Sequence, residues 1–143
     1  MRFVIVASEF YQDITDNLIR GAESVFRDEF SRNGSLLIHR IPGSNEIPGT
    51  VQTVIDNDCP DVIITFGCII RGETKHFDII ADNVSSSLMG ISVRSSIPVI
   101  FGVLATENMK QAETRSDPQQ VNSGGECMRT AIRMLETYNE IKK

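Results

Sequence analysis

The chain has 143 residues, of which 41% are hydrophobic and 23% are charged, a composition typical of one soluble globular domain with a sizeable core. Its formal net charge of -5, its lack of tryptophan and its 6% aromatic residues argue against a nucleic-acid partner, which would need a basic surface with stacking side chains. The cysteines number three and are widely spaced, which excludes a disulfide framework and a CxxC motif, so we expect a cytoplasmic protein.

Strand and helix signals alternate along the chain. The first apolar run, residues 3–7, predicts a core strand, because five residues are too few for a signal peptide or a membrane span. Apolar residues at helical spacing then predict a helix over residues 13–30. The other expected strands are residues 36–41, 62–69 and 97–104, and the other expected helices are residues 47–55, 77–93, 107–114 and 125–141.

This alternation predicts the fold class. Residues 61–66 are apolar and β-branched without polar alternation, as in a strand that is covered on both faces. Consecutive parallel strands need long right-handed crossovers, which the intervening helices supply. We therefore expect an α/β fold, a three-layer α/β/α sandwich around a four-stranded parallel sheet of flavodoxin-like type, formed by residues 1–143 as a single domain.

Polar residues cluster where the strands are expected to end. Ligands of open α/β sheets bind beyond the carboxyl ends of the strands. We therefore expect one rim to be lined by residues 8–11, 42–46, 68–76 and 101–106.

The segment at residues 67–78 concentrates ionisable side chains after the third strand. Thr74 is expected to cap a helix whose first turn carries residues 75–78, which places His76 at a helix N-terminus. A histidine can donate or accept a proton near neutral pH. A lone histidine is more often structural, as we expect for His39. The other polar residues expected at the same rim favour a catalytic role for His76.

Several charged side chains have two interpretations. Arg71 and Lys75 beside free helix amides can bind an anion such as phosphate, or they can form solvated charge pairs with Glu73 or Asp78. Arg115 is either an anion ligand or a surface residue.

Other residues at the expected rim also leave alternatives open. Phe10 either covers a flat heterocycle or packs in the core. Ser44, Asn45 and Glu46 either cap the next helix or bind a polar ligand. Cys68 is expected to be a buried strand-end residue rather than a nucleophile, since no activating base is evident.

Three motifs, PGSNEIP at residues 42–48, RGETKHFD at 71–78 and PVIFGVL at 98–104, resemble those of the 6,7-dimethyl-8-ribityllumazine synthase family. The resemblance spans nearly the whole chain. It implies condensation of 5-amino-6-(D-ribitylamino)uracil with 3,4-dihydroxy-2-butanone 4-phosphate, in the penultimate step of riboflavin biosynthesis. It implies no metal and no organic cofactor.

The resemblance also implies roles for individual residues. Phe10 would stack on the pyrimidine, His76 would transfer protons, and Phe101 would come from the neighbouring subunit. The ribitylaminouracil would be held by Ser44, Asn45, Glu46, Cys68, Ile69 and Ile70, and the phosphate-bearing substrate by Glu73, Thr74 and Arg115.

Two positions depart from the family pattern. Asn45 stands where an aromatic residue is usual, and Ser123 with Gly124 stands where lysine and glycine are usual. The lost positive charge predicts weaker affinity for the phosphorylated substrate, with Arg115 carrying more of the binding. The departures leave an alternative open, a diverged lumazine- or flavin-binding relative with weak or no catalysis.

The resemblance further implies a homo-oligomer, a pentamer at minimum, with small-molecule substrates and no membrane partner. Many relatives carry a longer N-terminal segment that lies along a neighbouring sheet, and shell-forming relatives carry a glycine and lysine pattern that residues 116–123 lack. We therefore expect an isolated pentamer rather than a decamer or a shell of sixty subunits.

Overall fold

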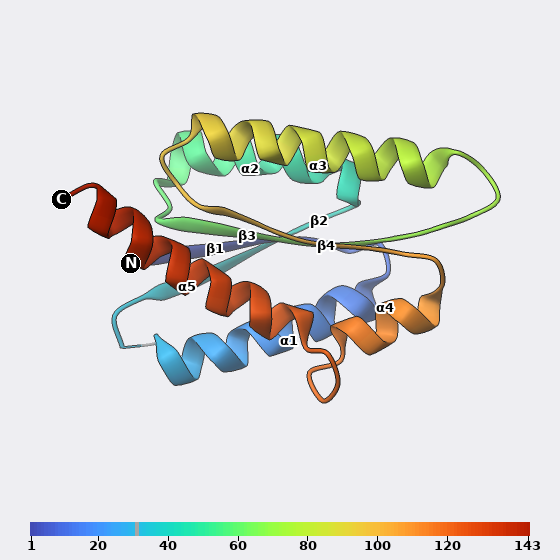
Figure 1. The fold of residues 1–143 in the computed structure, drawn as a ribbon, viewed down its shortest axis with the longest axis horizontal. Helices are drawn as coiled ribbons and strands as arrows, with labels where there is room; N and C mark the ends of the chain where they lie inside the picture. Colours follow the sequence, from blue (N-terminus) through green and yellow to red (C-terminus); the bar gives the residue numbers. More distant parts are fainter. Residues whose placement is uncertain (31) are drawn as a thin grey trace.

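The computed structural model describes residues 1–30 and 32–143, and its helices and strands alternate along the chain (Figure 1). The strands are β1 (Arg2–Ser8), β2 (Ser35–Ile41), β3 (Val62–Ile70) and β4 (Val99–Thr106). The helices are α1 (Gln12–Glu29), α2 (Ile47–Asp58), α3 (His76–Arg94), α4 (Met109–Ser116) and α5 (Ser123–Ile141), and a 3-10 turn, η1 (Ser44–Glu46), precedes α2.

Across the described residues the strands form one parallel sheet in the order β2-β1-β3-β4. Helices α2 and α3 cover one face of the sheet, and α1, α4 and α5 cover the other (Figure 1). The predicted three-layer sandwich is therefore confirmed. None of the helices among the described residues is long and apolar enough to cross a membrane.

The two central strands account for the unbroken apolar runs in the sequence. Residues 3–7 of β1 and residues 62–64 of β3 are fully buried. Alternate side chains point to opposite faces of a strand, so Phe3 and Ile5 join the core beneath α1 and α5, whereas Val4 and Val6 join the core beneath α2 and α3. A strand covered on both faces cannot alternate with polar residues.

The fourth strand lies two residues later than predicted. Pro98 has no amide hydrogen to donate, and its carbonyl accepts the Ile63 amide at 3.0 Å just before the strand begins. The strand continues through Thr106, which pairs with Ile70 at the end of β3. Phe101 consequently pairs with Thr65 in mid-sheet, and its expected position at the carboxyl rim is wrong.

Capping residues shift the starts of two helices. Helix α4 begins at Met109 because the Asn108 side chain accepts the Gln111 amide at 2.9 Å. Helix α5 begins at Ser123, two residues earlier than predicted, because the Asn122 side chain accepts the Gly125 amide at 3.2 Å. The turn η1, before α2, was not predicted.

Candidate active site

A cavity of about 430 Å³ lies where the rim was predicted, beyond the carboxyl ends of β1, β2 and β3. It is lined by Phe10, Tyr11, Gly43, Ser44, Asn45, Glu46, Cys68, Ile69, Ile70, His76 and Ile80. Eight of these residues were predicted as site residues, and they come from four separate parts of the chain. The parallel sheet brings them together because its strands all end at the same edge.

The end of β3 forms an apolar wall of the cavity. Cys68 and Ile69 are buried, with exposed fractions of 2% and 7%. Burial raises the pKa of the Cys68 thiol to about 11, because a thiolate would lose its hydration there. The prediction of a buried strand-end cysteine is confirmed, and a thiol that stays protonated at neutral pH is a poor nucleophile.

The turn η1 presents polar groups beside that wall. A Cβ atom on Gly67 would lie 2.6 Å from the Ser44 hydroxyl oxygen, so glycine in β3 lets the turn approach the strand closely. No side-chain hydrogen bond caps α2 at Glu46, so the predicted capping alternative is not found. The side chains of Asn45 and Glu46 line the cavity instead.

Phe10 lies at the mouth of the cavity, not in the core. Its side chain is 63% exposed, and its ring meets the Tyr11 ring edge-on at a centroid distance of 4.9 Å. Its amide donates to the Ser8 hydroxyl at 3.2 Å. Tyr11, which belongs to the predicted rim but was not singled out as a site residue, has a left-handed backbone with φ 58° before α1 begins. Nothing in the sequence marks an aromatic residue for that conformation, which non-glycine residues seldom adopt.

His76 is the first residue of α3 and lines the cavity with Ile80, one turn later. Its placement at a helix N-terminus is confirmed. Its amide donates to the Thr74 hydroxyl oxygen at 3.3 Å. Lys75 precedes the helix, so the prediction that it belongs to the first turn is wrong. Ile80 could have been anticipated, because positions four apart lie on one face of a helix.

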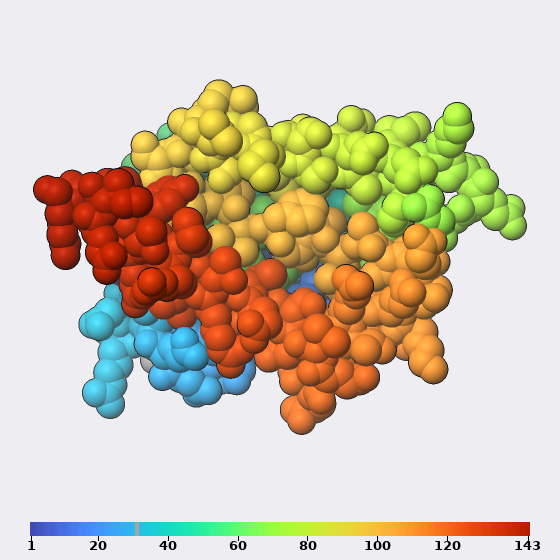
Figure 2. Space-filling model, viewed as in Figure 1, coloured from blue at the N-terminus to red at the C-terminus, as the bar shows by residue number. Residues whose placement is uncertain are grey.

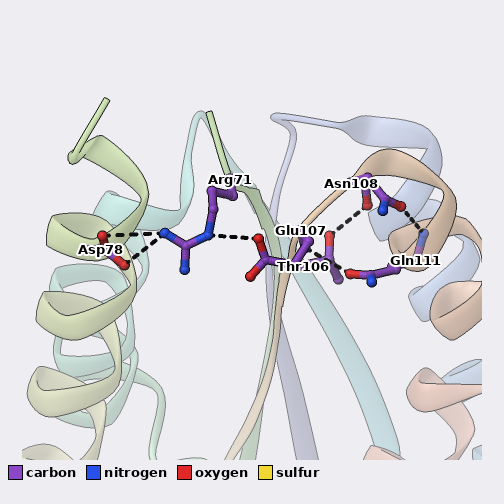
Figure 3. Close-up of polar contacts among 6 residues, drawn as sticks. All are labelled: Arg71, Asp78, Thr106, Glu107, Asn108 and Gln111. Atoms are coloured by element: carbon purple, nitrogen blue, oxygen red, sulfur yellow. Dashed lines mark hydrogen bonds and ion pairs between the residues drawn. The ribbon is translucent and has the colours of Figure 1, made fainter. Parts of the chain in front are cut away.

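Arg71 pairs with carboxylates, which is the second of the two interpretations left open by the sequence. Its Nη1 lies 3.4 Å from Asp78 Oδ1, which is one of the predicted alternatives, and its Nε donates to Glu107 Oε2 at 2.8 Å (Figure 3). Its guanidinium also lies over the Phe77 ring at 4.3 Å. Glu107 was missed because it lies 36 residues away in sequence.

Four predicted site residues do not line this cavity. Glu73 and Thr74 are exposed in the loop before α3. Phe101, which is 48% exposed, lines a separate hollow with Ser123 and other residues of α5. Arg115 lines a third hollow along α4. Figure 2 shows the face on which β4 is visible between α3 and α5.

His39 lies on β2, away from the cavity, with its Nε2 atom 3.5 Å from Asp58 Oδ2. This contact fits the structural role expected for it. Within the described part of the chain, no three His, Cys, Asp or Glu side chains are grouped so that they could hold a metal ion.

Comparison with known proteins decides the family. Residues 1–139 match the model of the family described as 6,7-dimethyl-8-ribityllumazine synthase. The chain belongs to the 6,7-dimethyl-8-ribityllumazine synthase family. The lumazine synthase of Bacteroides fragilis is 35% identical over 143 residues, all of both chains, and that of Phocaeicola vulgatus is 35% identical over 143 residues, all of this chain and 85% of the relative. The lumazine synthase of Chlorobium phaeobacteroides is 35% identical over 139 residues, 97% of this chain and 90% of the relative.

Proposed function

We propose that this chain is a transferase that condenses 5-amino-6-(D-ribitylamino)uracil with 3,4-dihydroxy-2-butanone 4-phosphate. The products are 6,7-dimethyl-8-ribityllumazine, phosphate and two molecules of water, in the penultimate step of riboflavin biosynthesis. Family membership and the names of full-length relatives support this activity. We further propose that residues 1–143 act as a single cytoplasmic domain that needs no metal or organic cofactor.

One observation carries the assignment of the site. The residues that the family resemblance gives to the ribitylaminouracil line a single cavity, although they come from three different strand ends. The exposed ring of Phe10 is available to stack on the pyrimidine, with its apolar face against a flat heterocycle. Hydroxyl, amide and carboxylate groups of Ser44, Asn45 and Glu46 can bond the ribityl chain and the ring.

The reaction asks mainly for alignment and proton transfer. An amine of the uracil attacks the ketone carbonyl, and water leaves as the imine forms. Elimination of phosphate gives an enol that tautomerises to a new carbonyl. The second amine attacks this carbonyl, and loss of a second water closes the ring. The diamine is already nucleophilic, so holding both substrates in register supplies much of the acceleration. His76, at the N-terminus of α3 and on the cavity wall, is the proposed proton-transfer group for these steps.

The remaining proposed contacts concern the phosphorylated substrate and the assembly. Glu73 and Thr74 would approach it from the loop before α3, and Arg115 would bind its phosphate. Phe101 would reach the cavity of an adjacent subunit, which accounts for its large exposure on edge strand β4 in a single chain. We therefore propose a homopentamer with active sites between subunits.

The test is formation of lumazine from both substrates in steady state, compared with His76→Ala. We expect turnover in the wild-type protein and a loss of roughly a hundredfold in kcat for the variant, the size typical of a general acid–base group. Unchanged turnover in His76→Ala would remove the proton-transfer role. Binding of lumazine without its formation in a single turnover would favour the diverged binding protein instead.

A further inference from the structure

The guanidinium of Arg71, just after β3, links the first turn of α3 to the loop that follows β4. Its Nε donates to Glu107 Oε2 at 2.8 Å, on the loop after β4. Its Nη1 lies 3.4 and 3.5 Å from the two carboxylate oxygens of Asp78, in the first turn of α3 (Figure 3). The same group lies over the ring of Phe77 at 4.3 Å. One side chain therefore contacts two consecutive residues of that turn and one residue outside it.

The side of this bridge at β4 is held by its own network. The Arg71 amide donates to the Thr106 carbonyl at 2.9 Å and so extends the ladder between β3 and β4. The Glu107 amide donates to the Gln111 side chain at 2.8 Å, and the Gln111 amide donates to the Asn108 side chain at 2.9 Å. These two bonds form a capping arrangement at the start of α4, similar to a capping box. They fix the backbone of Glu107, whose carboxylate is held by Arg71.

The other side, the first turn of α3, is held on its inner face by Phe77, which is 9% exposed and packs in the core beneath α2 and α3. On its outer face, the contacts between Asp78 and Arg71 are joined by a hydrogen bond from the His76 amide to the Thr74 hydroxyl at 3.3 Å, and Lys75 provides no side-chain capping bond. The preceding residues 71–75 are exposed, and a Cβ atom on Gly72 would meet nothing within 4 Å. Exposed loops with few buried contacts open most readily, and this loop leads directly into His76, which is itself exposed. A contact that restrains Phe77 and Asp78 also restrains His76 beside them.

We propose that Arg71, through Glu107, is a positioning residue that holds His76 against the substrate cavity. The proposal rests on the proton-transfer role proposed above for His76. A single exposed ion pair contributes little to stability. Here a planar guanidinium has two carboxylate partners and an aromatic one, a geometry that lysine cannot reproduce. A catalytic group displaced by about 1 Å can lose a hundredfold in rate.

The test compares Arg71→Met and Arg71→Lys with the wild-type enzyme. We expect kcat to fall by about tenfold to a hundredfold in Arg71→Met, with KM of each substrate changed by less than about threefold. The kcat of Arg71→Lys should be close to that of Arg71→Met, because the planar guanidinium is lost although the positive charge remains. The matched control is Arg129→Met, which removes another exposed arginine that pairs with two carboxylates, Glu126 and Glu29, and should leave kcat unchanged.

A double-mutant comparison separates positioning of His76 from a direct effect on substrate. In the His76→Ala background, Arg71→Met should change kcat by less than about twofold, because contributions made through one group do not add. A further tenfold loss in that background, or an unchanged kcat in Arg71→Met alone, would overturn the proposal.

Hydrogen exchange provides a readout that does not depend on activity. Arg71→Met should speed exchange of the amides at residues 79–81, in the first turns of α3, and leave α5 unchanged. Unchanged exchange at α3 would contradict the proposed restraint. Absence of turnover in the wild-type protein, with exchange altered as expected, would reject the proposed function and keep the restraint. If Arg71→Met fails to fold, Arg71→Lys carries the same comparisons.

Discussion

At the scale of single residues, burial decides what the three cysteines can do. Burial raises the pKa of Cys68 to about 11, and burial together with the nearby charge of Glu126 raises the pKa of Cys127 to about 11. Cys59 is exposed at the end of α2. The reactive form of cysteine is the thiolate, so two of the three thiols are unreactive near neutral pH for a physical reason that residue type alone does not reveal.

Alkylation with iodoacetamide should therefore be selective. At pH 8 we expect rapid modification of Cys59 alone, with Cys68 and Cys127 labelled only after denaturation. Peptide mass mapping checks the order of labelling. Early labelling of Cys68 in the folded protein would contradict its place in the cavity wall.

The raised pKa values of Cys68 and Cys127 also affect stability. The folded state keeps protons that the unfolded chain releases, so these thiols should lower the free energy of unfolding as pH rises from about 9 to about 11.

At the scale of elements, the contact between α1 and α5 depends on a glycine. A Cβ atom on Gly124 would overlap the backbone carbonyl of Leu18, which is fully buried in α1. Backbone atoms cannot move aside as the end of a flexible side chain can. The absence of a side chain at Gly124 is thus what lets the start of α5 lie directly on α1.

Gly124→Ala should destabilise the protein by about 3 kcal/mol, since overpacking forces helices apart. Gly49→Ala is the matched control, because Gly49 lies in helix α2 and its Cβ would meet nothing within 4 Å. It should stabilise the protein by about 0.5–1 kcal/mol through helix propensity. Denaturant unfolding at one fixed protein concentration measures both changes. Equal effects of the two substitutions would show that the α1–α5 contact tolerates a methyl group.

Local patterns in the sequence were sufficient for the order of the elements and for most of the cavity. The apolar runs of β1 and β3 lack polar alternation, which indicates burial on both faces, and the strand-end rule then gathers Phe10, Ser44 and His76 correctly. Contacts over long separations were not accessible in this way. The pairing of Arg71 with Glu107 depends on the register between β3 and β4, which no local pattern records.

At the scale of the whole molecule, the predicted site residues fall into two groups. One group, which includes Phe10 and His76, lines the cavity at the ends of β1, β2 and β3. The other includes Phe101 and Arg115, which line separate hollows beside β4 and α4. A substrate in the cavity of one subunit can meet the second group if it belongs to a neighbouring copy. A heterologous interface of this kind generates a closed ring when its rotation closes.

Two inactive variants should therefore restore activity when they share a ring. In the proposed shared site, His76→Ala changes the subunit that provides the cavity and Arg115→Ala changes its neighbour. Random mixing of the two variants would then leave about one quarter of the sites with both halves intact. We expect each variant alone to be nearly inactive, and the two refolded together to recover up to that fraction of wild-type turnover. Light scattering should give a mass about five times the 15.9 kDa of the chain.

The matched control mixes His76→Ala with Phe10→Ala, whose substitutions both lie in the cavity of one subunit. No arrangement of these two variants yields an intact cavity half, so turnover should stay at the average of the separate variants. Differently tagged chains purified through both tags show that mixed rings have formed. In such rings, no gain for His76→Ala with Arg115→Ala would mean that both residues serve a site within one subunit. Equal gains in the two mixtures would point to stabilisation on mixing rather than to shared sites.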